Sequence, residues 1–178
     1  TIVVDAGDCS QGDYAVNVHL RSPGTNSLEA FYCTVVDNPD GGVKAADYGD
    51  SWREGNAVLK NNIIAYNGSV GLRFQNENWN LGSYPLSSNL LFASYNDVYG
   101  QTADYDITNA DPATESISAD PRFVNRGGDD YHLNGGPCLG IGTDVGVTVD
   151  LAGTTRVGFD LGCYEAIPPA EGSIILMR

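Results

Sequence analysis

Two basic residues, Lys44 and Arg73, are the side chains whose type and spacing could do chemistry, because they occupy equivalent positions of an internal repeat. Acidic residues follow them closely, at Asp47, Asp50 and Glu77. A polysaccharide lyase abstracts a proton with a base held beside carboxylates. A glycoside hydrolase needs two carboxylates roughly 5 to 10 Å apart, and an acid-rich surface offers such pairs by chance. We therefore interpret these residues as surface charges and assign no catalytic residue, with a lyase or glycosidase as the alternative.

Aromatic residues gather in two polar segments, 45–56 and 75–89, which interrupt the repeat at the same point. The rings are those of Tyr48 and Trp52 in the first segment and of Trp79 and Tyr84 in the second. If successive repeats stack, these rings lie on one side of the molecule, where exposed aromatic patches usually mark a contact. They predict a carbohydrate-binding platform, with Lys44 and Arg73 beside it for an acidic saccharide. The alternative is that both segments fold over the repeat and bury the rings as a satellite core.

The repeat covers residues 32–44 and 57–74, at an offset of about 29 residues. It aligns Val35 with Ile64, Asn38 with Asn67, Gly42 with Gly71 and Val43 with Leu72. Short segments rich in β-branched residues and interrupted by Asn and Gly predict strands joined by tight turns. One such coil cannot bury its apolar side alone, so coils are expected to stack about 4.8 Å apart. Asn38 and Asn67 would then form a ladder of side-chain amides along the turns.

Further strands are expected on either side of the repeat. Residues 15–20 alternate apolar with polar, which is typical of a half-buried strand. Residues 28–36 begin the next coil, and residues 90–98 have the pattern of another. Residues 101–116 have the composition of a polar loop.

Two groups of aspartates could supply the oxygen ligands that calcium prefers. They are Asp5, Asp8 and Asp13 in the first group and Asp37 and Asp40 in the second. Neither group has the EF-hand spacing, and aspartate favours turns through its own hydrogen bonding. We therefore expect no cofactor and no metal site, and calcium is the one ion kept as a candidate.

Residues 119–165 carry five short motifs in a fixed order. They are residues 119–124 (ADPRFV), 130–133 (DYHL), 136–142 (GPCLGIG), 150–153 (DLAG) and 159–165 (FDLGCYE). The series resembles the C-terminal module of many bacterial exported β-helix proteins, the choice-of-anchor Q type in the pectate-lyase-like superfamily, with motifs DPxFV, DYHL, SPAIDAG, DLDG and D-[IL]-G-[AC]-Y-E. This resemblance implies an all-β fold, a short right-handed parallel β-helix of about four coils, with the C-terminal module as its cap. Gly140 and Ala152 replace two aspartates of those motifs, so a cation-binding role for these carboxylates is not carried over.

The resemblance also implies a disulfide. Cys138 and Cys163 stand where the family motifs have small residues, and matched cysteines at both positions predict that the positions touch. Closing a loop of about 25 residues would contribute roughly 3 kcal/mol of stability. Cys9 and Cys33, about one coil apart, are a second candidate pair, because adjacent strands suit the spacing that a disulfide requires.

Composition and charge narrow the function. The 178 residues contain 23 acidic and 9 basic side chains, a formal net charge of −14. Nucleic acid is therefore not an expected partner, because its phosphates would be repelled and no basic stripe is present. No run approaches the roughly 18 apolar residues of a membrane span. The four cysteines lack a CxxC spacing, and with the acidic, Gly-rich composition they favour an exported protein over a zinc ribbon.

We expect a single β-helix domain over residues 1–167, with the coils in 1–116 and the C-terminal module in 117–167. A proline-led tail, 168–178, follows, and its apolar run 173–177 (SIILM) could donate a strand to a neighbouring molecule.

These observations predict a non-catalytic, secreted or cell-surface module, structural or adhesive, that contacts polysaccharide. A second alternative to this function, besides the enzyme, is a self-assembling filament subunit. Nothing before Val16 has the pattern of a cap for the first coil, and an open edge invites pairing with another molecule.

Overall fold

The computed structural model describes residues 3–4, 14–20, 27–47, 56–76, 91–107 and 114–166. Its strands form three parallel sheets and one antiparallel pair. Sheet 1 contains β1 (Val3–Val4), β4 (Thr34–Val36), β7 (Ile63–Ala65) and β10 (Asp97–Tyr99). Sheet 2 contains β2 (Val16–Leu20), β5 (Gly41–Asp47), β8 (Val70–Asn76) and β11 (Ala103–Ile107). Sheet 3 contains β3 (Ser27–Phe31), β6 (Asn56–Lys60) and β9 (Leu91–Ser94).

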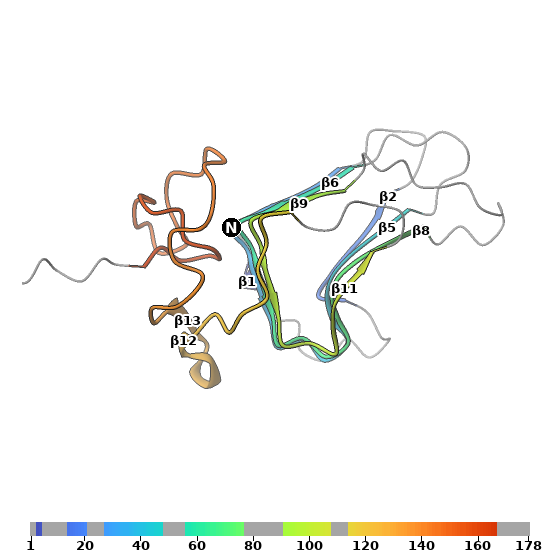
Figure 1. Ribbon diagram of the computed structural model, residues 1–178, viewed down its shortest axis with the longest axis horizontal. Coiled ribbons are helices and arrows are strands. Elements are labelled where there is room, and N and C mark those ends of the chain that lie inside the picture. The colour runs from blue at the N-terminus through green and yellow to red at the C-terminus, as the bar shows by residue number, and fades with distance from the viewer. Residues whose placement is uncertain are drawn as a thin grey trace, which may run out of the picture.

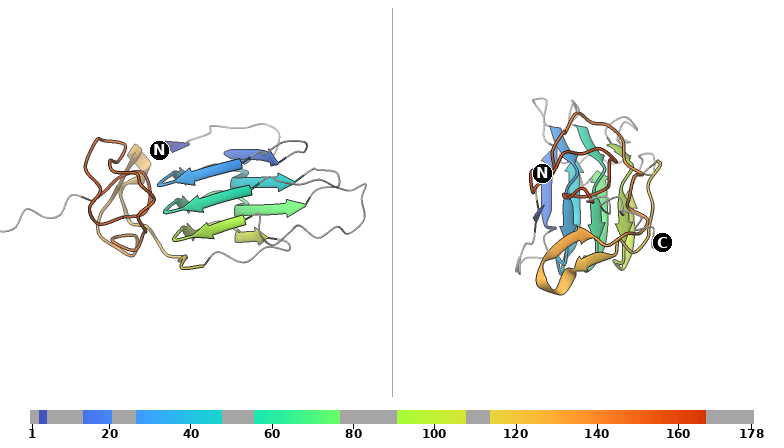
Figure 2. Two further views of the ribbon diagram at one scale, coloured as in Figure 1. Left: turned by 90° about the horizontal axis from the view of Figure 1, so that it is seen from above. Right: turned by 90° about the vertical axis from the view of Figure 1, so that its left-hand side faces the viewer.

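The chain passes through sheets 3, 1 and 2 in the same order three times, as β3-β4-β5, β6-β7-β8 and β9-β10-β11 (Figure 1). Each strand pairs in parallel with its counterpart in the next pass, so that Val35 lies opposite Ile64 and Val43 opposite Leu72. The predicted repeat and its register are therefore confirmed. The all-β expectation is also confirmed, and the stacked parallel sheets are what a parallel β-helix requires (Figure 2).

One segment differs from the prediction. Residues 101–116 were expected to form a polar loop, yet Ala103–Ile107 is strand β11, which pairs in parallel with β8. Tyr105 and Ile107 of this strand pack against the core. The two aspartates, Asp104 and Asp106, give the segment the composition of a loop, although they alternate with Tyr105 and Ile107 as in a half-buried strand.

Left-handed backbone turns the chain between sheets. The residue that follows sheet 3 has a positive φ in every pass, at Tyr32, Asn61 and Tyr95 (φ 53°, 61° and 55°). The residue that follows sheet 1 does the same, at Asp37, Tyr66 and Gly100 (φ 59°, 57° and 77°). A non-glycine residue in this region costs of order 1 kcal/mol or more, so the surrounding structure must hold each corner.

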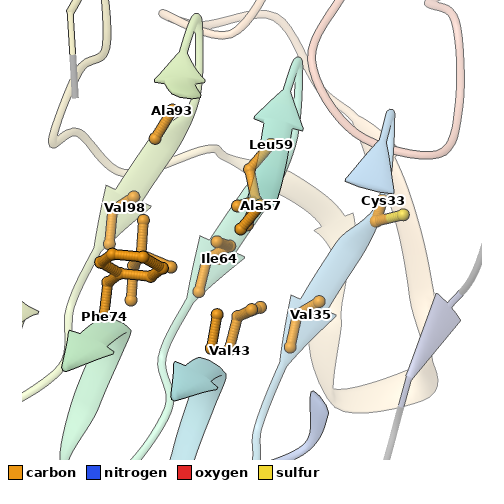
Figure 3. Close-up of a cluster of buried hydrophobic side chains, with 11 residues drawn as sticks. Cys33, Val35, Val43, Ala57, Leu59, Ile64, Phe74, Ala93 and Val98 are labelled. Carbon is orange, nitrogen blue, oxygen red and sulfur yellow. The ribbon is translucent and has the colours of Figure 1, made fainter. Parts of the chain in front are cut away.

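The inward faces of the three sheets share one apolar core. Val35, Ile64 and Val98 come from neighbouring strands of sheet 1 and are at most 2% exposed, while Leu59 and Phe74 reach them from sheets 3 and 2 (Figure 3). Burying each side chain of this size contributes roughly 1.5–3 kcal/mol. The same cluster includes Cys33, Val43, Ala45, Ala57, Leu72 and Ala93.

The C-terminal module contains β12 (Phe123–Asn125), the short helix η1 (Arg126–Gly128) and β13 (Asp130–Leu133), followed by irregular chain to residue 166. The sequence predicted this module as a cap on the stack. It lies instead along the side of the stack, against the outer face of sheet 1 (Figure 2). The reason is that sheet 1 is apolar on both faces: Ile63 and Ala65 point outward and are buried against the module's Leu161.

Strand β1 is the outermost strand of sheet 1 at the amino-terminal end of the stack. Val3 pairs with Thr34 and Val4 with Val35, so β1 extends sheet 1 and does not cross the end of the stack. The tail 168–178, with its predicted donor strand 173–177, lies outside the described residues. The part of the chain that the structure describes contains no helix long and apolar enough to cross a membrane.

Candidate functional site

The predicted asparagine ladder is present at the corner between sheets 1 and 2. Asn38 Nδ2 donates to Asn67 Oδ1 at 2.8 Å, and the same oxygen accepts from Asn38 N–H at 3.2 Å. Asn67 Nδ2 donates to the Val35 carbonyl at 3.0 Å, and Asn67 N–H donates to Gln101 Oε1 at 3.3 Å. Both asparagines are 2% exposed. Gln101 continues the ladder with a longer side chain, which is why the repeat pattern did not reveal it.

A second ladder, which the sequence reasoning missed, lies at the corner between sheets 3 and 1. Cys33 N–H donates to Asn62 Oδ1 at 2.8 Å, and Asn62 Nδ2 donates to Asn96 Oδ1 at 2.9 Å. Asn96 N–H then donates to Ser116 Oγ at 3.1 Å. Asn62 stands directly before β7 and Asn96 directly before β10, and this shared position was the available signal.

The outer face of sheet 2 carries a polar column, defined as Asn17, Lys44, Arg73 and Asp106. These four residues are register partners across β2, β5, β8 and β11. They alternate with core residues, so they face away from the core. The prediction that Lys44 and Arg73 stack on each other is therefore confirmed.

Arg73 of the polar column contacts another column residue, Asp106, and the neighbouring Tyr14. Arg73 Nε lies 3.3 Å from Asp106 Oδ2, and Arg73 Nη1 donates to the Tyr14 hydroxyl at 3.3 Å. Lys44 Nζ lies 6.0 Å from the centroid of the same Tyr14 ring. The ring packs against Gly41, where a Cβ would stand 2.6 Å from it. Tyr14 thus bonds Arg73 and lies beside Lys44, a role that its isolated position in the sequence did not indicate.

The predicted aromatic platform cannot be placed directly, because Tyr48, Trp52, Trp79 and Tyr84 all lie outside the described residues. The described strand ends do locate the segments that carry them. Strand β5 ends at Asp47 and β8 at Asn76, and these two residues are register partners. Both segments therefore begin at neighbouring strand ends of sheet 2. These are the carboxyl ends of the strands that bear the polar column.

Of the candidate calcium ligands, Asp37 and Asp40 lie within the described residues. The Asp37 carboxylate is bound by Arg126, with Nε 2.9 Å from Oδ1 and 3.1 Å from Oδ2. The Arg126 guanidinium also lies 3.8 Å from the centroid of the Tyr66 ring. This clamp ties the β12–β13 hairpin to the corner of the stack. Among the described residues no group of three or more His, Cys, Asp or Glu side chains is placed to hold a metal, while Asp5, Asp8 and Asp13 lie outside them.

The module's motifs form a buried polar network. Asp150 accepts hydrogen bonds from the backbone N–H of Thr154 and Glu165, at 2.7 and 2.9 Å. Glu165 in turn accepts from Val157 N–H at 3.0 Å, and its Oε2 lies 3.4 Å from Nη1 of the buried Arg156. Such carboxylates supply the acceptors that a module with little regular structure lacks. Their role here is structural.

Asp160 belongs to the same network. Its carboxylate accepts from Gly140 N–H at 2.6 Å and from Ala166 N–H at 2.8 Å. Burial raises the pKa of Asp160, while these two hydrogen bonds act in the opposite direction.

Among the carboxylates that the structure describes, Asp97 has a strongly raised pKa. It is fully buried between β10 and the module, where it accepts from Ala119 N–H at 3.0 Å and from the Cys138 thiol at 3.2 Å. Burial raises the pKa of Asp97 from 3.8 to about 6, and the two hydrogen bonds oppose that rise. Burial, followed by the nearby Asp97 charge, raises the pKa of the Cys138 thiol. The thiol is therefore an unreactive donor.

The predicted disulfide between Cys138 and Cys163 is wrong, because both are free and buried. The two segments do lie side by side, since Leu161 N–H donates to the Cys138 carbonyl at 2.9 Å. However, the Cys138 thiol points to β10, whereas Cys163 N–H donates to Thr34 Oγ1 of β4 at 3.1 Å. Strand β7 separates β4 from β10.

The second candidate pair is also not formed. Cys33 is free, and its thiol lies 3.6 Å from the Phe31 carbonyl, to which it donates. Its predicted partner, Cys9, lies outside the described residues.

Comparison of the chain with protein-family models, with curated proteins and with solved structures finds no match.

Proposed function

We propose that this chain is a non-catalytic module that binds polysaccharide across the outer face of sheet 2. The fold in this proposal is a right-handed parallel β-helix of about four coils, because parallel crossover connections are right-handed in nearly all proteins. The C-terminal motifs support assignment to the choice-of-anchor Q type. That resemblance in turn supports export to the cell surface or beyond.

The observation that carries the proposal is the register of the polar column. Lys44 and Arg73 are held at one strand spacing, about 4.8 Å, by the pairing of β5 and β8. Donors at fixed spacing on a flat face suit the hydroxyl and carboxylate groups of a polymer. Both aromatic-bearing segments leave the sheet beside this column, and aromatic rings suit the apolar faces of sugars. An acidic saccharide is the favoured class, because the column's cations lie on an otherwise acidic chain.

Binding is favoured over catalysis by how Arg73 is used. Its guanidinium contacts Asp106 and Tyr14, so the one carboxylate of the column is already engaged by a cation. A lyase would need a base directed at the substrate, and a glycosidase would need a carboxylate pair flanking a bond. These enzymes are the alternative that the experiment must separate from binding.

A glycan array followed by calorimetry tests the proposal. The chain should bind uronate-containing polysaccharides saturably, and Lys44→Ala should weaken binding at least tenfold. Lys60→Ala is the matched control, since Lys60 lies on sheet 3 and its removal changes the net charge equally. The paired variants Trp52→Ala and Trp79→Ala should abolish binding while the melting temperature stays within about 2 °C of the parent, since 1 kcal/mol corresponds to roughly 2–4 °C in a chain of this size.

Two results would contradict the proposal. Accumulation of unsaturated uronates, followed by ultraviolet absorbance, would identify a lyase. A large drop in melting temperature on replacing Trp52 and Trp79 would mean that their rings are packing residues, as in the satellite-core alternative.

A further inference from the structure

The sequence contains two Asn–Gly pairs, Asn67–Gly68 and Asn134–Gly135. Such a pair can modify itself, because glycine has no side chain to shield its backbone nitrogen, and this nitrogen can attack the amide of the preceding asparagine. The structure places the two pairs in opposite environments. Asn67 is 2% exposed at the corner between sheets 1 and 2, whereas Asn134 is exposed in the turn that follows β13.

Hydrogen bonds hold every group of the Asn67–Gly68 pair that the reaction would need. Gly68 N–H donates to the Asn38 carbonyl at 2.7 Å. Asn67 Oδ1 accepts from Asn38 Nδ2 at 2.8 Å, and Asn67 Nδ2 donates to the Val35 carbonyl at 3.0 Å. A Cβ added to Gly68 would overlap the Pro39 carbonyl, so the backbone is also tightly packed. The Asn67 amide therefore cannot turn toward the Gly68 nitrogen unless the ladder opens.

The Asn134–Gly135 pair lacks these restraints. In the part of the chain that the structure describes, neither the Asn134 side chain nor the Gly135 N–H has a hydrogen-bond partner. Asn134 N–H does donate to the Arg122 carbonyl at 2.8 Å, but this bond fixes only the backbone ahead of the side chain. Apart from its chain neighbours, no described atom lies within 4 Å of the position that a Cβ of Gly135 would take. The Gly135 nitrogen is therefore accessible to the neighbouring amide.

We infer that Asn134 is a site of spontaneous deamidation. The Gly135 nitrogen bonds to Asn134 Cγ, the Cγ–Nδ2 bond breaks, and Nδ2 leaves as ammonia with the proton of the Gly135 nitrogen. Water then opens the cyclic imide at either carbonyl and yields aspartate or isoaspartate. Both products add a negative charge to the turn between β13 and Pro137, and isoaspartate also adds one carbon to the main chain. The modification accumulates in the module while the asparagine ladder of the stack stays intact.

Incubation of the full chain at mildly alkaline pH, followed by trypsin digestion and mass spectrometry, tests this inference. Trypsin gives peptide 127–156, whose one asparagine is Asn134, and peptide 61–73, which carries Asn67. In the native chain, aspartate and isoaspartate forms of the first peptide should appear at least roughly tenfold faster than a change at Asn67, because Asn67 reacts only when the stack opens. In guanidinium chloride, both pairs should react at similar rates.

Two variants serve as controls in the native chain. Asn134→Gln keeps a side-chain amide but must form a larger ring, so peptide 127–156 should stay unmodified. Gly135→Ala places a methyl group beside the attacking nitrogen, in open space, and should slow the reaction.

Three outcomes would overturn the inference. A peptide 127–156 that changes in guanidinium chloride but not in the native chain would show that the fold protects Asn134. Equal rates at Asn67 and Asn134 in the native chain would show that the hydrogen bonds of the ladder do not decide the reactivity. An unchanged peptide 127–156 in both conditions would show that Asn134 does not deamidate.

Discussion

Replacing Asp97 by Asn should stabilise the protein at neutral pH. Asp97 is fully buried between sheet 1 and the module, and burial raises its pKa from 3.8 to about 6. Folding therefore disfavours the ionised carboxylate. The penalty is absent below pH 3.8, grows between pH 4 and 6 and is complete above pH 6. Asparagine keeps the acceptor for Ala119 N–H and carries no charge.

The magnitude follows from the pKa difference. A rise of about two units corresponds to about 3 kcal/mol at neutral pH and to roughly half of that at pH 5. The variant loses its acceptor for the Cys138 thiol, which costs about 1 kcal/mol. The expected gain is thus about 2 kcal/mol at pH 7.5 and about 0.5 kcal/mol at pH 5.

Urea unfolding of parent and variant at pH 5 and pH 7.5 measures this change, and both conditions lie above the isoelectric point near 4.1. Asp120→Asn is the control. The pKa of Asp120 is lowered, mainly by the hydrogen bond from the Tyr66 hydroxyl, so its contribution should not vary between the two conditions. A stability difference for Asp97→Asn that is equal at both pH values, or that favours the parent more strongly at pH 7.5, would refute the reasoning.

Three further predictions concern the supports of the fold. Asn67→Ala should lower the unfolding free energy, measured by urea unfolding, by about 2–4 kcal/mol, because it leaves buried ladder groups unpaired. The control is Asn134→Ala, which should cost under about 0.5 kcal/mol because Asn134 is exposed. Arg126→Ala should cost about 1 kcal/mol by the same assay, since its contacts with Asp37 and Tyr66 are partly exposed. The three described cysteines should resist alkylation in the native protein and react in urea without reductant; a thiol that reacts only after reduction would restore the disulfide.

The sequence predicted the elements whose signal is local and repeated. The pairing of Val35 with Ile64, the Asn38–Asn67 ladder and the stacking of Lys44 on Arg73 all follow from one alignment, because parallel strands in register place equivalent residues side by side. Strand β11 was not predicted, because its two aspartates give it the composition of a loop. A polar composition indicates that a segment is exposed to solvent, and it does not distinguish a loop from a partly exposed strand such as β11 at the end of the stack.

The features that sequence reasoning missed depend on contacts between distant segments. Arg126 binds Asp37 across 89 positions, and the module docks on sheet 1 because that sheet is apolar on its outer face. The strand pattern of three buried residues, as in Ile63–Ala65, does carry that information: a strand buried on both faces needs a partner on each. The Cys138 thiol donates to Asp97 of β10, whereas the Cys163 backbone N–H donates to Thr34 of β4, and motif matching alone does not resolve this separation.

One measurement tests the central claim most directly: light scattering of an array-selected uronate polysaccharide mixed with the chain. The account predicts that a complex forms and that the polymer keeps its length after the protein is removed. Lys44→Ala should reduce the amount of complex, and Lys60→Ala should leave it unchanged. A shortened polymer would contradict the claim by revealing an enzyme, and an unbound polymer at saturating protein would contradict it by removing polysaccharide as the partner of sheet 2.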